Sequence, residues 1–130
     1  MSLEEAVDRL RSRYRLHAVV LFGSRARGDW GPWSDYDLLV VADFDAPYLE
    51  RIGEIMELLE GLGPIEPHPY TLEEAVSMLR RGCPTLVDAL EEGEVLFEGP
   101  GLALLRKIHE SLKRRGMRRT KTSIWVPELE

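Results

Sequence analysis

The sequence predicts one α/β or α+β domain in which helices flank a small β-sheet, and three observations support this. The chain has 130 residues, which suits a single domain with a core of its own. Short apolar runs alternate with segments whose apolar residues recur at helical spacing. Gly and Pro clusters separate these segments, as expected at loops. No internal repeat or low-complexity tract is present.

The first half of the chain is expected to hold two helices and two strands. Ser2 to Glu5 is a capping box, so a helix should run from there to about Tyr14. Residues 17–22 and 35–41 are apolar enough for buried strands, and the polar residues 23–34 between them are expected to form a loop. A second helix should run from Pro47 to about Glu60. Its expected apolar face consists of Leu49, Ile52, Met56 and Leu59.

The second half begins with an unusual strand, residues 65–70, whose sequence is IEPHPY. Pro67 and Pro69 lack N–H groups on the same side, so this strand should lie at a sheet edge. Further helices are expected over 71–81, 84–92 and 102–115, with a strand over 94–98. Residues 116–130 show no clear period.

Charge is distributed unevenly along the chain. Residues 1–105 carry 9 Lys/Arg and 20 Asp/Glu, whereas residues 106–130 carry 8 Lys/Arg and 3 Asp/Glu. The basic segment could bind nucleic acid, bind an acidic partner, or fold back on its own acidic body. The overall net charge of −6 repels a polyanion, which favours the last two interpretations.

The chain has one cysteine, Cys83, and no Cys/His cluster at zinc spacing. No apolar run is long enough for a membrane span, and Met1 leads into a charged segment rather than a signal peptide. We therefore expect a soluble, cytoplasmic protein. Cys83 is expected to pack at a helix start, because no base partner for a nucleophile is evident.

Two aspartates at the start of the second strand indicate a metal site. Asp35 and Asp37 should project from the same strand face, two rises apart, or roughly 7 Å. Carboxylates held this close repel each other unless a cation lies between them. Mg²⁺ is commonly bound by one or two carboxylates together with substrate phosphates. Alone, such a pair is more often a solvated strand start.

The end of the first strand offers groups that suit a phosphate. Gly23 lets the backbone approach a ligand, and the Ser24 hydroxyl with nearby N–H groups can bind phosphate oxygens. Arg25 and Arg27 add cationic donors. Together with the aspartates, these groups indicate a nucleoside triphosphate bridged by Mg²⁺, although the Walker A pattern is absent.

The spacing Gly23-Ser24, ten residues, then Asp35-Tyr36-Asp37 resembles the signature of the DNA polymerase beta-like nucleotidyltransferase superfamily. GSRARG followed by SDYDLLV is most similar to its minimal nucleotidyltransferases. The similarity covers residues 1–98, expected to form the nucleotidyltransferase domain. Residues 99–130 are expected to form a helix and basic tail packed on the same domain.

The resemblance implies a small mixed sheet flanked by helices, two Mg²⁺ ions, and transfer of a nucleoside monophosphate, AMP from ATP, with release of pyrophosphate. By the family pattern Ser24 would hold terminal phosphate oxygens, and Asp35 and Asp37 would hold both metals. The pattern also expects a third carboxylate on a later strand. The candidate is Glu66, in place of the commoner aspartate; the alternative is an exposed glutamate at the sheet edge.

The resemblance further implies a partner, a HEPN-domain toxin that this chain would counteract by adenylylating or by binding it. The alternative is a catalytically weak or inert module that regulates a partner by binding, with possible RNA contact through residues 106–121. If Glu66 faces the site, His68 and Tyr70 share its face by alternation, although a surface role for His68 is favoured. Trp30 and Trp33 could stack on a base, but burial that anchors the loop is favoured.

Overall fold

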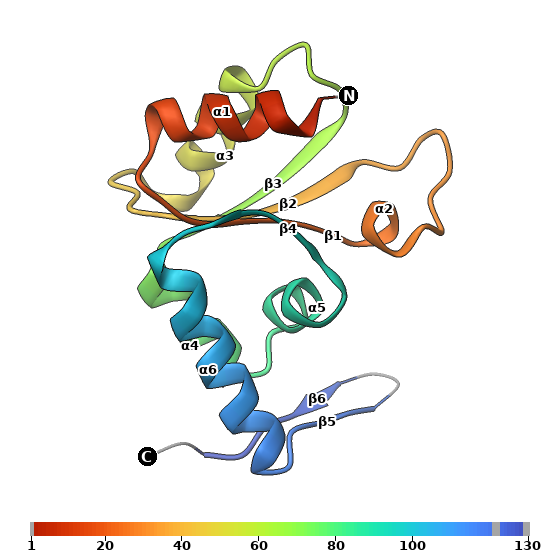
Figure 1. The fold of residues 1–130 in the computed structure, drawn as a ribbon, viewed down its shortest axis with the longest axis vertical. Coiled ribbons are helices and arrows are strands. Elements are labelled where there is room, and N and C mark those ends of the chain that lie inside the picture. Colours follow the sequence, from red (N-terminus) through yellow and green to blue (C-terminus); the bar gives the residue numbers. More distant parts are fainter. Residues whose placement is uncertain (1, 121–122, 129–130) are drawn as a thin grey trace.

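The computed structural model describes residues 2–120 and 123–128. A four-stranded sheet forms the middle layer, and helices cover both of its faces (Figure 1). The strands are β1 (Leu16–Phe22), β2 (Tyr36–Ala42), β3 (Ile65–Tyr70) and β4 (Glu94–Glu98), in the spatial order β3-β2-β1-β4. β1 runs antiparallel to β2 and β4, whereas β2 and β3 are parallel. This mixed sheet flanked by helices confirms the predicted fold class.

The helices form two groups, one on each face of the sheet (Figure 1). α1 (Leu3–Arg13) and α3 (Tyr48–Leu58) cover one face; α4 (Leu72–Arg80), α5 (Pro84–Glu92) and α6 (Pro100–Arg114) cover the other. Side chains of β1 and β2 alternate between these two cores, so Val19 and Leu38 pack toward α1 and α3 while Val20 and Leu39 pack toward α4–α6. Burial on both faces explains why these two strands are continuously apolar.

The apolar face predicted for α3 is wrong at Leu49 and Met56 and correct at Leu59. Leu49 and Met56 are exposed, at 79% and 53% of their surface, whereas Arg51, Ile55 and Leu59 face the core. The buried set recurs every four residues and includes an arginine, which hydrophobic periodicity alone does not select. Arg51 is buried because its guanidinium finds acceptors there, including the Ala46 carbonyl at 2.6 Å.

Two short elements were not predicted. The loop after β1 contains a single helical turn, α2 (Ser24–Arg27), which ends at Gly28 in the left-handed conformation. After α6, β5 (Arg118–Arg119) and β6 (Ile124–Trp125) form a two-stranded hairpin. Ile124 and Val126 pack against the core on the α4–α6 side. A two-residue strand is too short for its alternation to be recognised in the sequence.

The basic C-terminal segment contacts acidic residues of the same chain. Arg106 donates to Glu98 at 2.6 Å, and Arg119 pairs with both Asp88 and Glu91. Folding back on the acidic body was one of the three interpretations of this segment. Lys121 lies outside the described residues. Among the helices that the structure describes, none is long and apolar enough to cross a membrane.

Candidate active site

The pairing of β2 with β3 positions the candidate site. β3 is an edge strand, as Pro67 and Pro69 predict, and it pairs with β2 on its other side. In this register Asp37 lies directly opposite Glu66. Neighbouring strands are about 4.8 Å apart, so two carboxylates in register on one face are brought close together.

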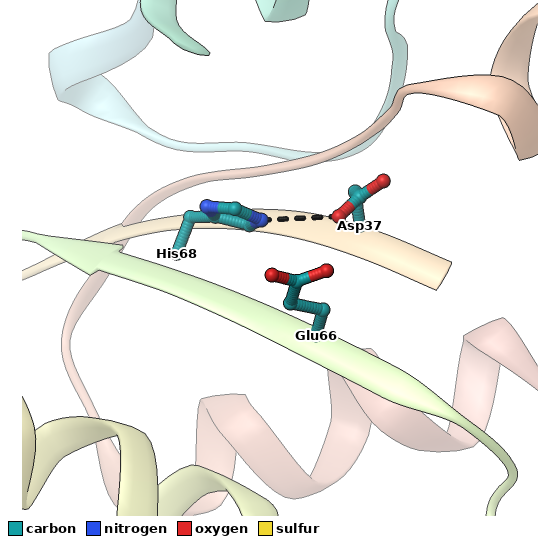
Figure 2. A group of neighbouring side chains, drawn as sticks. All are labelled: Asp37, Glu66 and His68. Carbon is teal, nitrogen blue, oxygen red and sulfur yellow. Dashed lines mark hydrogen bonds and ion pairs between the residues drawn. The ribbon is translucent and has the colours of Figure 1, made fainter. Parts of the chain in front are cut away.

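Asp37, Glu66 and His68 form a compact group at this position (Figure 2). One potential ligand atom from each residue lies within 4.8 Å of the others. His68 Nε2 is 3.1 Å from Asp37 Oδ1, and the Glu66 carboxylate points toward the same pair. The group thus offers two carboxylates and one imidazole, all of them metal-ligand types.

The negative charge of this group is only partly balanced. The pKa of Glu66 is raised, first by burial and then by its hydrogen bond with Asp37 and the repulsion between the two carboxylates. Asp35 adds to the repulsion, and His68 opposes it. A divalent cation between the carboxylates would relieve this repulsion.

Asp35 lies one residue before β2 and is exposed. In the part of the chain that the structure describes, Asp35 is not among the residues whose ligand atoms come together with those of Asp37. Its charge nevertheless contributes to the raised pKa of Glu66, after the larger effects of burial and of Asp37. Of the three predicted carboxylates, the structure therefore brings Asp37 and Glu66 together and leaves Asp35 at the margin.

Gly23 lies against the Asp37 carboxylate. Its φ of +75° is in a region that L side chains rarely adopt, and a Cβ built there would collide with Asp37 Oδ2. Ser24 follows as the first residue of α2. The predicted phosphate-binding residues therefore adjoin the carboxylates.

Arg25 and Arg27 have partners within the loop. Arg25 donates to the Ser34 carbonyl through Nε at 3.1 Å and Nη2 at 2.9 Å. Its guanidinium lies 4.3 Å from the ring centres of both Trp30 and Tyr36. Arg27 pairs with Asp29 at 3.2 Å and with Glu92 at 3.5 Å. Both arginines hold the loop together in this structure.

The expected anchoring of the loop by buried tryptophans is wrong. Trp33 is 84% exposed, with its ring near Gly31, and Trp30 is half exposed. The loop is instead fixed by Arg25, which stacks on Trp30 and reaches the backbone of Ser34. A planar cation between two rings explains how an exposed tryptophan still orders a loop.

The favoured surface role for His68 is also wrong. Its side chain is 19% exposed, bonds to Asp37, and packs edge-on against Phe22 at 4.9 Å between ring centres. The alternation of side chains along the strand, which places His68 on the same face as Glu66, was the signal in the sequence that could have predicted this position. Tyr70 continues this face and stacks on Tyr48 at 5.4 Å.

Comparisons with known proteins agree with this geometry. The family model of the nucleotidyltransferase domain matches residues 3–96. The chain belongs to this family. The suspected superfamily is thereby confirmed, and with it a transferase class that uses a nucleoside triphosphate and a divalent metal ion.

A curated relative of this nucleotidyltransferase comes from Methanocaldococcus jannaschii and is named "Putative protein adenylyltransferase MJ0604". The two are 44% identical over 50 residues, which are 37% of this chain and 50% of the relative. The chain thus spans about half the length of the curated relative it matches.

Solved structures share the fold of this nucleotidyltransferase. A chain of a toxin–antitoxin complex with AMP-PNP superposes with a TM-score of 0.57 at 17% identity, covering 88% of this chain and 90% of that one. A chain of a mutant of the toxin–antitoxin pair MntA-HpeT superposes with a TM-score of 0.60 at 17% identity, covering 88% of this chain and 89% of that one. A structure from Sulfolobus solfataricus described as a "putative nucleotidyltransferase" superposes with a TM-score of 0.52 at 20% identity, covering 73% of this chain and 76% of that one.

The residues of this nucleotidyltransferase fit a divalent cation. Asp37 and Glu66 offer oxygen ligands in register on neighbouring strands, and burial together with the adjacent Asp37 carboxylate raises the pKa of Glu66. The end of β1 adjoins Asp37 directly through Gly23.

Proposed function

We propose that this nucleotidyltransferase transfers AMP from ATP to a protein acceptor in the cytoplasm, as the antitoxin of a HEPN toxin pair. The observation that carries the proposal is the placement of Asp37 opposite Glu66, with Gly23 against the Asp37 carboxylate. Carboxylates beside a phosphate-binding turn are the arrangement that metal-assisted phosphoryl chemistry requires.

Each predicted residue has a role in this proposal. Two Mg²⁺ ions, when bound, would stabilise the attacking and leaving oxygens of an in-line displacement. Asp35 and Asp37 would hold the ions, and Glu66 would complete the set and orient the acceptor hydroxyl. Gly23 and Ser24 would receive the terminal phosphates. Arg25 and Arg27 would donate to phosphate only after giving up loop contacts, so we assign them a supporting role.

The protein acceptor is supported by the relatives. The Methanocaldococcus relative carries the name "Putative protein adenylyltransferase", and two of the solved structures are toxin–antitoxin complexes. In this proposal the partner brings the acceptor to the open edge of the sheet beside β3.

The test combines the chain, a HEPN-domain partner and ATP labelled in its α-phosphate and adenosine. We expect AMP to be transferred to the partner in the presence of Mg²⁺. The Asp35→Asn/Asp37→Asn variant should lose at least about 10³-fold in rate, since both metal-holding carboxylates are removed. Asp43→Asn is a matched control, because Asp43 pairs with His17 outside the site. Labelling that survives in the double variant contradicts the proposal.

A second candidate is a module that neutralises its partner by binding without turnover. It is favoured by the engagement of Arg25 and Arg27 within the loop, which leaves their guanidinium groups occupied. In this case stoichiometric neutralisation would occur without ATP and would be equal in the Asp35→Asn/Asp37→Asn variant. Neutralisation that needs ATP and is lost in that variant would exclude it.

A further inference from the structure

The group of Asp37, Glu66 and His68 contains an imidazole that the sequence did not assign to the metal site. His68 lies with Asp37 and Glu66 in one group, on the same face of β3 as Glu66. The inference drawn from this imidazole rests on the metal dependence in the proposed function, but it is independent of the acceptor.

The geometry suits direct binding by His68. An octahedral ion with bonds of about 2.1 Å separates neighbouring ligand atoms by about 3 Å and opposite ones by about 4.2 Å. The ligand atoms of Asp37, Glu66 and His68 lie within 4.8 Å of one another, so small side-chain rotations bring them into this range. The ring already points its Nε2 at Asp37, and the edge contact with Phe22 supports that orientation.

The chemistry of the ring discriminates between ions. Mg²⁺ prefers oxygen ligands, whereas imidazole nitrogen suits first-row transition ions, whose affinities rise from Mn²⁺ to Co²⁺ and beyond. We propose that His68 binds the divalent ion directly through Nε2, and that this nitrogen makes the site favour a first-row transition ion over Mg²⁺. The Nε2 lone pair binds the ion while Nδ1 carries the ring proton, so the bond to Asp37 gives way to a shared ion.

A role restricted to positioning leads to a different outcome. If His68 only held Asp37 through the 3.1 Å hydrogen bond, removing the imidazole would weaken the binding of every cation to a similar degree. A direct nitrogen ligand instead affects transition ions much more than Mg²⁺. The ratio of two affinities therefore separates ligand from positioning residue.

The experiment measures Co²⁺ and Mg²⁺ binding to the full chain by calorimetry, in the wild type and in His68→Gln. The glutamine amide can still donate to Asp37, but its nitrogen has no lone pair for a metal. We expect the Kd for Co²⁺ to rise by at least about tenfold, and that for Mg²⁺ to change less than about threefold. Equal weakening of both ions, or no change in either, would overturn the inference.

His17→Gln is the matched control. His17 pairs with Asp43 at 2.8 Å, so this variant also removes an imidazole bonded to an aspartate, but outside the metal group. Both of its Kd values should equal those of the wild type. If the wild type binds Mg²⁺ and its affinity for Co²⁺ is no higher, the inference fails while the proposed function stands. If it binds neither ion, even with ATP, the proposed metal dependence itself fails.

A spectroscopic measurement tests the nitrogen without reference to affinity. Pulsed electron paramagnetic resonance of the Mn²⁺-loaded chain should show modulation from ¹⁴N of a bound imidazole. The modulation should be absent from His68→Gln and retained in His17→Gln. Near-ultraviolet circular dichroism of the ion-free variants checks that both keep the native packing. Modulation that persists in His68→Gln would show that His68 is not the ligand.

Discussion

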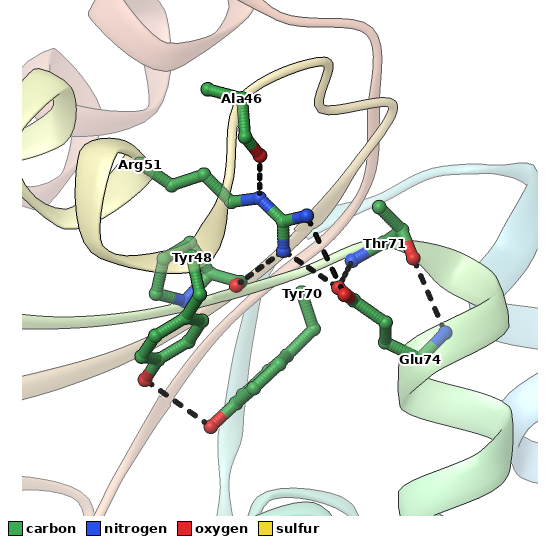
Figure 3. Close-up of polar contacts among 7 residues, drawn as sticks. Ala46, Tyr48, Arg51, Tyr70, Thr71 and Glu74 are labelled. Atoms are coloured by element: carbon green, nitrogen blue, oxygen red, sulfur yellow. Dashed lines mark hydrogen bonds and ion pairs between the residues drawn. The ribbon is translucent and has the colours of Figure 1, made fainter.

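Charged groups at the two ends of β3 contrast sharply. At its start, Asp37, Glu66 and His68 gather two carboxylates around one imidazole (Figure 2). Beyond its end, Arg51 and Glu74 form a pair within a dense network (Figure 3). The Arg51 guanidinium is 2.6 Å from both the Ala46 carbonyl and Glu74 Oε1, and also reaches the Pro69 carbonyl at 3.4 Å.

The pKa shifts of the two glutamates differ in sign. Burial acts to raise the pKa of Glu74, but hydrogen bonds from Arg51 and the Thr71 backbone outweigh it, and the pKa is lowered. Burial and the neighbouring Asp37 carboxylate raise the pKa of Glu66. The Arg51 group is therefore neutralised by the chain itself and is structural. The Glu66 group keeps an excess of negative charge that a bound cation would balance.

The largest effect is expected from Arg51→Met, which removes the cation of the balanced group. Breaking a buried ion pair costs about 3–5 kcal/mol, and we expect about 2–3 kcal/mol here because Glu74 keeps 44% of its side chain exposed. Urea unfolding measures the loss. Arg13→Met removes the exposed pair with Glu54 and should cost less than about 1 kcal/mol. Equal losses of unfolding free energy in the two variants would contradict the structural role assigned to Arg51.

A smaller effect is expected from Glu74→Gln, and it should depend on pH. Because the folded pKa of Glu74 lies below 4.5, its charge contributes stability above that pH. The contribution disappears as the pH falls through the folded pKa. At pH 7 the variant should be less stable by up to about 1 kcal/mol, and the difference should vanish in acid. Melting curves of the wild type and the variant from pH 7 into acid test the sign of this pH dependence. A stability difference that widens in acid would refute it.

The smallest effect is expected from Glu66→Gln in metal-free protein, with the opposite sign. Because the folded pKa of Glu66 lies above 4.5, ionisation at higher pH costs stability, and glutamine avoids this cost. The Tm at pH 7 should rise by about 1–2 °C and the gain should shrink toward pH 4. Divalent cations should raise the Tm of the wild type more than that of the variant. A lower Tm at pH 7 would show that Glu66 is not under repulsion.

The sequence was sufficient for features set by local rules. The capping box at Thr71 and Glu74 and the prolines of β3 predicted a helix start and an edge strand, and both are present. Such signals work because the missing or extra hydrogen bond belongs to the residue itself.

Features that depend on tertiary partners were missed. Arg51 is buried because acceptors from three separate segments surround it. His68 is partly covered because it contacts Asp37 of β2 and Phe22 of β1. Trp33 is exposed although its size favours burial, and the loop is held instead by the contacts of Arg25 with Ser34 and Trp30. The parallel register that aligns Asp37 with Glu66 is likewise a property of the assembled sheet.

The two prolines of β3 also protect the protein from self-association. An open strand edge normally presents alternating donors and acceptors that another chain can pair with, as in fibril growth. Pro67 and Pro69 supply no N–H, and the carbonyl of Pro69 accepts a hydrogen bond from Arg51 of α3. A second molecule that approached this side would find too few donors to extend the sheet. The face of β3 that carries Glu66 and His68 can therefore stay open to solvent without becoming a site of aggregation.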